Sequence, residues 1–155
     1  MFSEHSCVRE AARRMSGARG GGGGVIVNLS SRAAASGGDR LTHYAASKAA
    51  IEAFTRGFAR EAANIGVRVN AVSPGVIDTG LHGKAPGAAG APPAIGIGGT
   101  PPAFGIGGTP PGGPPADIPM GRAGTPDEVA EAILWLLSDG ASYITGAVVP
   151  VHGAR

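Results

Sequence analysis

Three short runs of the chain are almost wholly apolar and rich in β-branched residues. They cover residues 25–29, 67–72 and 147–151. Runs of this length and composition are typical of parallel strands that are covered on both faces. The pattern therefore predicts about three buried strands in one parallel sheet.

Apolar residues recur every third or fourth position in three further stretches, which predicts amphipathic helices. These stretches are residues 3–16, 42–64 and 125–138. Because predicted strands and helices alternate, we expect an α/β fold, a partial Rossmann arrangement with two or three helices flanking the sheet. We expect the whole chain, residues 1–155, to form a single domain of this type.

The predicted helices carry boundary signals and apolar stripes. Thr42 is a candidate N-cap and Gly66 a candidate stop, whereas Thr125, Pro126 and Glu128 form a capping-box pattern. The stripes comprise Cys7, Val8, Ala11, Ala12 and Met15 in the first helix and Val129, Ile133, Leu134, Leu136 and Leu137 in the last. Small residues form one face of the middle helix: Ala45, Ala46, Ala49, Ala50 and Ala53. Such a face suits close packing in a core or between subunits.

Glycine and proline concentrate in two segments. Residues 20–24 follow a predicted helix and precede a strand, which is the wrong order for a phosphate-binding loop, so we interpret them as a flexible connector. Residues 84–117 contain a tandem repeat, AIGIGGTPP followed by AFGIGGTPP. This segment has too few large apolar groups to offset the entropy of ordering, and we predict a disordered insertion.

Composition excludes several classes of function. The net charge is only +2 and no run of like charges resembles a nucleic-acid-binding stripe. The single cysteine, Cys7, cannot form an internal disulfide, which fits a reducing compartment. We find no export signal and no apolar stretch of about 20 residues that could span a membrane, and we therefore expect a cytoplasmic protein.

Candidate catalytic residues gather around the first predicted strand and the helix after it. Ser31 follows the strand, and Tyr44 and Lys48 lie four residues apart, on one face of the helix. A neighbouring fixed cation favours a phenolate, so Lys48 would bring Tyr44 toward proton exchange near neutral pH. A Tyr-x-x-x-Lys pair alone also occurs on ordinary solvated helix faces.

Other site chemistries are weaker. The four histidines fall in unrelated elements without metal-ligand spacing, so we expect no metal site. A hydrolase triad of Ser31, His43 and Asp39 lacks the G-x-S-x-G elbow, and His43 would point away from Tyr44. We expect Tyr143 to be a packed turn residue.

The order of the motifs NLSS, YAASK and VRVNAVSPGVIDT resembles the classical short-chain dehydrogenase/reductase family, and the glucose 1-dehydrogenase-like subgroup in particular. The resemblance implies reversible hydride transfer between NAD or NADP and a small-molecule carbonyl or alcohol. Tyr44 would be the general acid/base, Lys48 would lower its pKa and bind the ribose, and Ser31 would orient the substrate oxygen. The resemblance also assigns Pro74, Gly75, Ile77 and Thr79 to the nicotinamide, and implies a homo-oligomer, either a dimer or a tetramer.

The resemblance covers only the C-terminal half of the family pattern. The turn that binds the adenosine half of the cofactor is not in this sequence, and the insertion at 84–117 replaces the family's substrate lid. The alternative is therefore a catalytically inactive fragment that acts through subunit pairing. Its sheet would have one uncovered edge.

Overall fold

The computed structural model describes residues 2–38, 41–79 and 118–155. The helices are α1 (Phe2–Met15), α2 (Ala33–Ser36), α3 (Thr42–Ala62) and α4 (Pro126–Leu137), with short 3-10 turns at Gly17–Arg19, Ala63–Ile65 and Asp139–Ala141. The strands are β1 (Gly24–Leu29), β2 (Val67–Pro74) and β3 (Val148–Val151). The insertion predicted at 84–117 lies outside the described residues.

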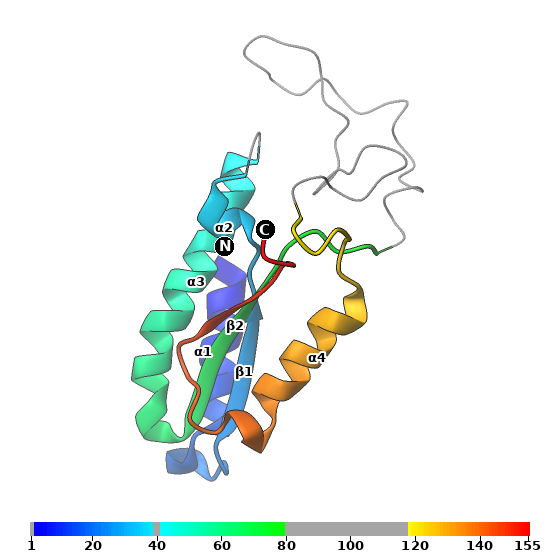
Figure 1. Cartoon of the computed structure of the whole chain (residues 1–155). Coiled ribbons are helices and arrows are strands. Elements are labelled where there is room, and N and C mark those ends of the chain that lie inside the picture. Colours follow the sequence, from blue (N-terminus) through cyan, green and yellow to red (C-terminus); the bar gives the residue numbers. More distant parts are fainter. Residues whose placement is uncertain (1, 39–40, 80–117) are drawn as a thin grey trace.

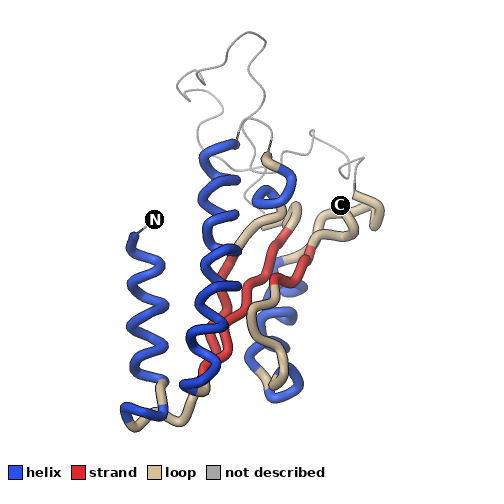
Figure 2. The backbone as a smooth tube through the Cα atoms, turned by 90° about the vertical axis from the view of Figure 1, so that its left-hand side faces the viewer, coloured by secondary structure: helices blue, strands red, loops and turns tan. Residues whose placement is uncertain are grey.

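The three strands form one parallel sheet in the order β1-β2-β3. Helices α1 and α3 lie on one face of the sheet and α4 lies on the other (Figures 1 and 2). The prediction of a partial Rossmann-type α/β fold with about three parallel strands is confirmed.

Each face of the sheet has its own apolar core. Under α1 and α3, the fully buried Val67 and Val69 of β2 pack with Ala12, Ala59 and Ala62. Under α4, Val72 packs with Leu136 and Ala141. Side chains alternate between the two faces of a strand, so one apolar strand, β2, supplies both cores.

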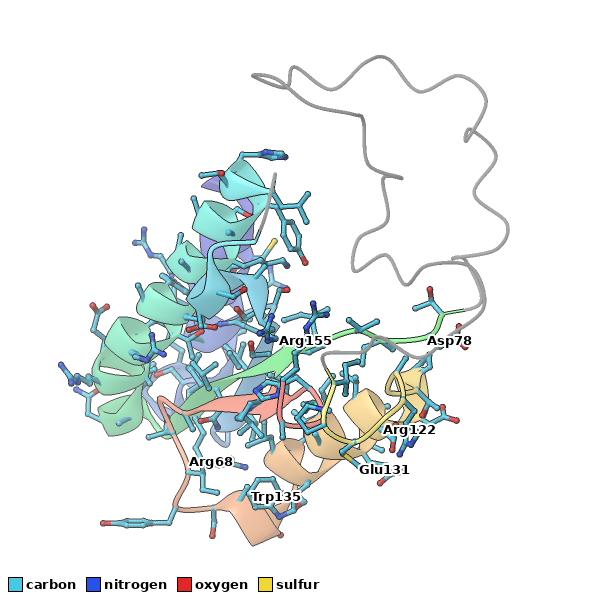
Figure 3. All side chains as sticks on the ribbon, turned by 45° about the horizontal axis from the view of Figure 1, so that its top comes forward. Arg68, Asp78, Arg122, Glu131, Trp135 and Arg155 are labelled. Atoms are coloured by element: carbon cyan, nitrogen blue, oxygen red, sulfur yellow. The ribbon has the colours of Figure 1, made fainter. Side chains whose placement is uncertain are left out.

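Arg68 fixes the C-terminal end of α4. Its guanidinium donates to the carbonyl oxygens of Leu136 at 2.9 Å, Ser138 at 3.1 Å and Ile144 at 3.4 Å. Figure 3 shows Arg68 beside the last turn of α4. The last carbonyls of a helix have no partner within the helix and carry partial negative charge, so a cation from β2 both caps and anchors α4.

The glycine-rich connector at residues 20–24 makes specific backbone contacts, and its flexibility stays a prediction. Gly21 donates to Ser16 O at 3.1 Å and Gly23 to Met15 O at 2.9 Å. A Cβ atom on Gly21 would lie 2.3 Å from Met15 O. Glycine is required here because two backbone segments approach each other closely.

Other local predictions are corrected by the structure. The N-cap of α3 is Leu41 and Thr42 is the first helical residue, whereas the capping box of Thr125 and Glu128 is confirmed. Tyr143 is fully exposed, at 102%. Several residues predicted to lie on buried or packing faces are exposed as well: Cys7, Ala46, Ala53, Leu134 and Leu137. In the described part of the chain, no helix is long and apolar enough to cross a membrane.

Candidate active site

Ser31 lies where the chain leaves β1 and is about to enter α2. The backbone on either side of it is still tied to β2, since Ser30 N donates to Val72 O at 2.8 Å and Arg32 N to Pro74 O at 2.9 Å. The Ser31 hydroxyl accepts from Ala33 N at 3.2 Å. Ser31 is half-buried and therefore sits at a well-defined position at the carboxyl end of β1.

Tyr44 and Lys48 lie in the first two turns of α3, one turn apart. The Lys48 ammonium is 5.8 Å from the centroid of the Tyr44 ring. Both residues are partly exposed, so the phenol and the ammonium border solvent. This is the spatial pairing that the four-residue spacing predicts.

Lys48 also contacts the end of β1. Its Nζ donates to Leu29 O at 2.9 Å. The neighbouring Ser30 hydroxyl donates to Glu52 Oε1 at 2.9 Å, which further ties the strand end to α3. The structure therefore places the Lys48 ammonium at the strand end two residues before Ser31, with the Tyr44 ring 5.8 Å from it. Sequence reasoning did not anticipate the contact with Leu29, because its partners are 19 residues apart.

The turn after β2 holds the remaining predicted site residues. Gly75 N donates to Val151 O at 3.0 Å, and Asp78 N donates to Gly124 O at 2.8 Å. Ile77 forms an isolated parallel bridge with Gly124. Pro74 and Ile77 are half-buried, whereas Thr79 is exposed. The turn is thus fixed to β3 and to the segment before α4.

Gly75 makes a close approach that the sequence did not reveal. A Cβ atom at this position would lie 2.6 Å from His152 Cβ and 2.9 Å from His152 Cα. Glycine was predicted here for access to a ligand. In the structure, its missing side chain makes room for the backbone that follows β3.

A cavity of ≈ 380 Å³ lies beside this turn, between the ends of β2 and β3 and the start of α4. Its lining includes Val76, Met120, Val151 and His152, but none of the predicted catalytic residues. His152 Nδ1 is buried and makes no hydrogen bond to the described residues. No sequence motif signalled this cavity.

An exposed ion pair borders the cavity. Arg122 donates to both carboxylate oxygens of Glu128, at 2.6 and 2.8 Å, and Glu128 Oε2 also accepts from Thr125 N at 2.8 Å. The hydrogen bond from Arg122, followed by the one from the Thr125 backbone, lowers the pKa of Glu128 to about 2. Arg122 in turn has a raised pKa because of Glu128. Figure 3 shows Arg122 at the first turn of α4.

The site residues match one half of a dinucleotide better than the other. A phenol and an ammonium beside a strand end are suitable donors for ribose hydroxyls, and the fixed turn after β2 offers backbone groups for a carboxamide. Among the residues that the structure describes, no strand leads through a glycine-rich turn into a helix, as a pyrophosphate site requires. These residues fit the nicotinamide riboside part of a cofactor.

Within the described residues, the structure shows no contacts that support the alternative hydrolase-triad or metal interpretations. The triad prediction includes Asp39, which lies outside the described residues, and His43 is exposed. Within residues 2–38, 41–79 and 118–155, no group of three or more His, Cys, Asp or Glu side chains could hold a metal ion.

Comparison with known families identifies the class of this site. Residues 1–88 match the short chain dehydrogenase family model, and residues 114–153 match a model described as Enoyl-(Acyl carrier protein) reductase. The first match covers more than half of the chain. The chain therefore belongs to the short-chain dehydrogenase family; the narrower glucose 1-dehydrogenase-like subgroup stays a prediction.

Individual relatives are longer than this chain. It is 41% identical over 150 residues to the uncharacterized oxidoreductase YgfF of Escherichia coli. This match covers 96% of this chain and 53% of YgfF. It is also 40% identical over 112 residues to 3-oxoacyl-[acyl-carrier-protein] reductase FabG of Pseudomonas aeruginosa. That match covers 72% of this chain and 37% of FabG. A solved short chain dehydrogenase/reductase family protein superposes with a TM-score of 0.71 at 33% identity, over 99% of this chain and 53% of the other. The chain spans about half or less of the length of these relatives.

Proposed function

We propose that this chain carries the proton-transfer part of an NAD(P)-dependent oxidoreductase that acts on a carbonyl or alcohol. The observation that carries the proposal is the Lys48 ammonium, 5.8 Å from the Tyr44 ring centroid. The contact of Lys48 Nζ with Leu29 O, two residues before Ser31, supports including Ser31 in the site. Family membership supports the same reaction class, because the curated relatives include reductases and dehydrogenases.

Each side chain then has a distinct role. When bound, the nicotinamide cofactor supplies or accepts the hydride. Tyr44 donates a proton to the carbonyl oxygen in reduction and takes it back from the alcohol in oxidation. Lys48, one helical turn after Tyr44, donates to the ribose hydroxyls. The Ser31 hydroxyl orients the substrate oxygen.

The turn after β2 provides the cofactor contacts in this proposal. Pro74 and Gly75 line the nicotinamide ring, while the Ile77 backbone and the Thr79 hydroxyl hold its carboxamide. The family resemblance supports these assignments, and the hydrogen bonds that fix the turn to β3 and to Gly124 would keep it in place. Either NAD or NADP is compatible with these residues, and the substrate is a small molecule. We place the reaction in the cytoplasm and expect a homo-oligomer that uses the alanine-rich face of α3.

A second candidate is a chain that is inactive on its own and acts through pairing with another subunit. Two observations favour it. Lys48 is hydrogen-bonded to Leu29 O, and related proteins are about twice as long as this chain. In this case the same residues become active only after another polypeptide supplies the adenosine half of the cofactor site.

Cofactor titration tests the proposal directly. Purified chain is titrated into NADH or NADPH while nicotinamide fluorescence is recorded, and saturable binding is expected if the chain acts by itself. Lack of saturable binding to either cofactor would instead support the second candidate.

Substitution of the tyrosines tests proton transfer by Tyr44. The variants are measured in the form that binds cofactor, either the chain alone or the chain with another subunit. Tyr44→Phe should lower turnover by about 10²- to 10⁴-fold, the usual contribution of a general acid/base. The chain has two tyrosines, and Tyr143 is fully exposed, so Tyr143→Phe is the matched control and should retain full turnover. Retained turnover in Tyr44→Phe would remove Tyr44 from its assigned role.

A further inference from the structure

The cavity beside the turn after β2 has walls of its own, which include none of the predicted catalytic residues. They comprise Val76, Glu128, three residues between positions 120 and 124, and residues 150–154. Glu128 belongs to α4, which lies on the opposite face of the sheet from α3, the helix of Tyr44 and Lys48 (Figures 1 and 2). A molecule in this cavity would therefore contact different residues from a substrate held by Tyr44.

The size of the cavity suits a small organic molecule. Its volume is ≈ 380 Å³. A water molecule takes up about 30 Å³ of liquid, and an apolar cavity of about 150 Å³ can bind benzene. Small-molecule sites in proteins usually have volumes of about 300 to 1,000 Å³. The cavity thus has room for a molecule with one six-membered ring and a short substituent.

Most of the wall is apolar. Val76 is buried, at 8% exposed, Val151 is half-buried, and Met120 is 63% exposed. Pro150 and Ala154 add further apolar surface. An apolar ligand would cover part of the Met120 side chain and gain hydrophobic free energy, and a methionine adapts readily to the shape of what it contacts.

The two charged residues of the wall neutralise each other. Arg122 donates to both carboxylate oxygens of Glu128, at 2.6 and 2.8 Å, and Glu128 also accepts from Thr125 N. An anionic ligand would have to compete with Glu128 for Arg122 and would be repelled by the carboxylate. A cationic ligand would meet the reverse difficulty with Arg122. The cavity therefore favours an uncharged ligand.

His152 supplies a polar group that has no partner among the described residues. Its Nδ1 atom is buried and makes no hydrogen bond to them. Leaving a buried polar atom without a partner is costly and uncommon. In a neutral imidazole, Nδ1 is a donor or an acceptor according to the tautomer, and a hydroxyl group can pair with either. Because His152 lines the cavity, a ligand hydroxyl could provide the missing hydrogen bond.

The backbone holds His152 in place at the cavity wall. A Cβ atom on Gly75 would lie 2.6 Å from His152 Cβ, so the two backbones are closely packed. Met120 N donates to Gly153 O at 3.4 Å. Gly153 and Ala154 both have left-handed φ angles, 62° and 66°. This conformation costs a non-glycine residue about 1 kcal/mol or more, and such strain is found preferentially at functional sites. The wall is therefore built before any ligand arrives.

We propose that this cavity is a binding site for a compact, uncharged and largely apolar molecule that carries a hydroxyl group. The hydroxyl pairs with His152 Nδ1, and the apolar part covers Val76 and Met120. The site is separate from the proposed proton-transfer site and does not depend on it. The alternative occupant of the cavity is water alone.

Titration with phenol tests the site directly, with toluene as a control ligand of the same shape that has a methyl group in place of the hydroxyl. The isotope-labelled full chain is titrated without cofactor while its amide chemical shifts are recorded. Phenol should cause saturable shifts at Val76, Gly124 and Ala154, with a dissociation constant of about 1 mM or lower. No saturable shift, or shifts centred on Tyr44 and Lys48, would overturn the proposal.

Two variants of similar shape test the hydrogen bond. His152→Asn keeps a polar atom at the position of Nδ1, whereas His152→Leu replaces it with a methyl group. The leucine variant should bind phenol about 3- to 10-fold more weakly than the asparagine variant, and toluene at least as tightly. Equal phenol binding by the two variants, or an equal loss of both ligands in the leucine variant, would contradict a bond to His152. His43→Phe, a change at an exposed histidine, is the control and should bind both ligands as the wild type does.

The experiment gives a result whether or not the proposed function is correct. The carbon that bears the phenol hydroxyl carries no hydrogen, so phenol cannot be oxidised by loss of a hydride. Binding is measured without NADH or NADPH. A chain that binds phenol but neither cofactor would contradict the proposed function and leave the second site established, and the reverse result would overturn the second site alone.

Discussion

Strands β1 and β2 share one sequence pattern but have different surroundings. Residues 25–28 read Val-Ile-Val-Asn and residues 67–70 read Val-Arg-Val-Asn. In β2 the two valines and the asparagine are fully buried, whereas every residue of this pattern in β1 is only half-covered. The difference arises from neighbours, since within residues 2–38, 41–79 and 118–155 β2 has a strand on each side and β1 has one. A sequence pattern specifies that a strand can be interior, and the number of neighbours decides whether it is.

The largest difference in stability between the two strands is expected at their asparagines. Asn70 donates to Ile144 O at 2.9 Å and accepts from Ala147 N at 3.0 Å, whereas Asn28 donates only to Thr55 Oγ1 at 2.9 Å. Asn70→Leu leaves the Ala147 N–H without a partner and Ile144 O with only the 3.4 Å bond from Arg68, and should lower the free energy of unfolding by about 3 kcal/mol. Asn28→Leu should cost about 1 kcal/mol, because Thr55 keeps its own bond to Ile51 O. Urea unfolding measures both, and equal costs would contradict the comparison.

Valine truncation sharpens the same contrast without changing hydrogen bonds. Val69→Ala empties space in the core under α1 and α3 and should cost about 2.5 kcal/mol. Val27→Ala, in the register position opposite Asn70, should cost about 1 kcal/mol because its side chain is half-covered. Thermal unfolding of the two variants measures this difference, and a cost for Val27→Ala as large as that of Val69→Ala would mean that β1 is as deeply buried as β2.

The pH dependence of stability tests how much the Arg122–Glu128 ion pair stabilises α4, the helix that covers one face of both strands. The pKa of Glu128 is lowered to about 2 in the folded chain, below the ordinary 4.5, by Arg122 and then Thr125. The stabilisation is therefore present above about pH 4.5 and is lost as the pH falls toward 2. Thermal unfolding midpoints between pH 5 and pH 2.5 should fall less in Glu128→Gln than in the wild type. Glu131→Gln, an exposed change on the same helix, is the control, and high salt should reduce the difference.

The smallest effect is expected at the exposed end of β1. Leu29→Ser should change the free energy of unfolding by less than about 0.5 kcal/mol, since half of the side chain is already in water. It should nevertheless reduce self-association at high concentration, measured by light scattering, because it removes apolar surface from a sheet edge with which no strand of the described residues pairs. A large loss of stability would mean that Leu29 is part of the core.

The sequence predicted the elements better than their environments. Strands, helices and the Thr125–Glu128 capping box follow from local patterns, and the structure confirms them. Tyr143 and Leu134 were assigned to packed positions because their residue types favour burial, but their exposure depends on what else covers them. Contacts between distant residues, such as Arg68 to Leu136, leave no signal in a local pattern.

In the candidate site, too, local sequence patterns predict some features, whereas contacts between distant residues cannot be predicted. The spacing of Tyr44 and Lys48 predicts their proximity, because both lie on one helix. The hydrogen bond from Lys48 to Leu29 O could not be predicted, since its partners lie on a helix and a strand 19 residues apart. The catalytic roles of Ser31, Tyr44 and Lys48 and the cofactor contacts of Pro74, Gly75, Ile77 and Thr79 stay predictions.

The close approach of Gly75 to His152 has a consequence for mutational scanning. A larger residue at position 75 would push the C-terminal tail away from the turn, because its Cβ atom would overlap His152. A loss of cofactor binding in Gly75→Ala would therefore report displacement of the tail as readily as a blocked ligand. The effect of a side chain at position 75 thus depends on where residue 152 sits, so library designs should vary both codons together.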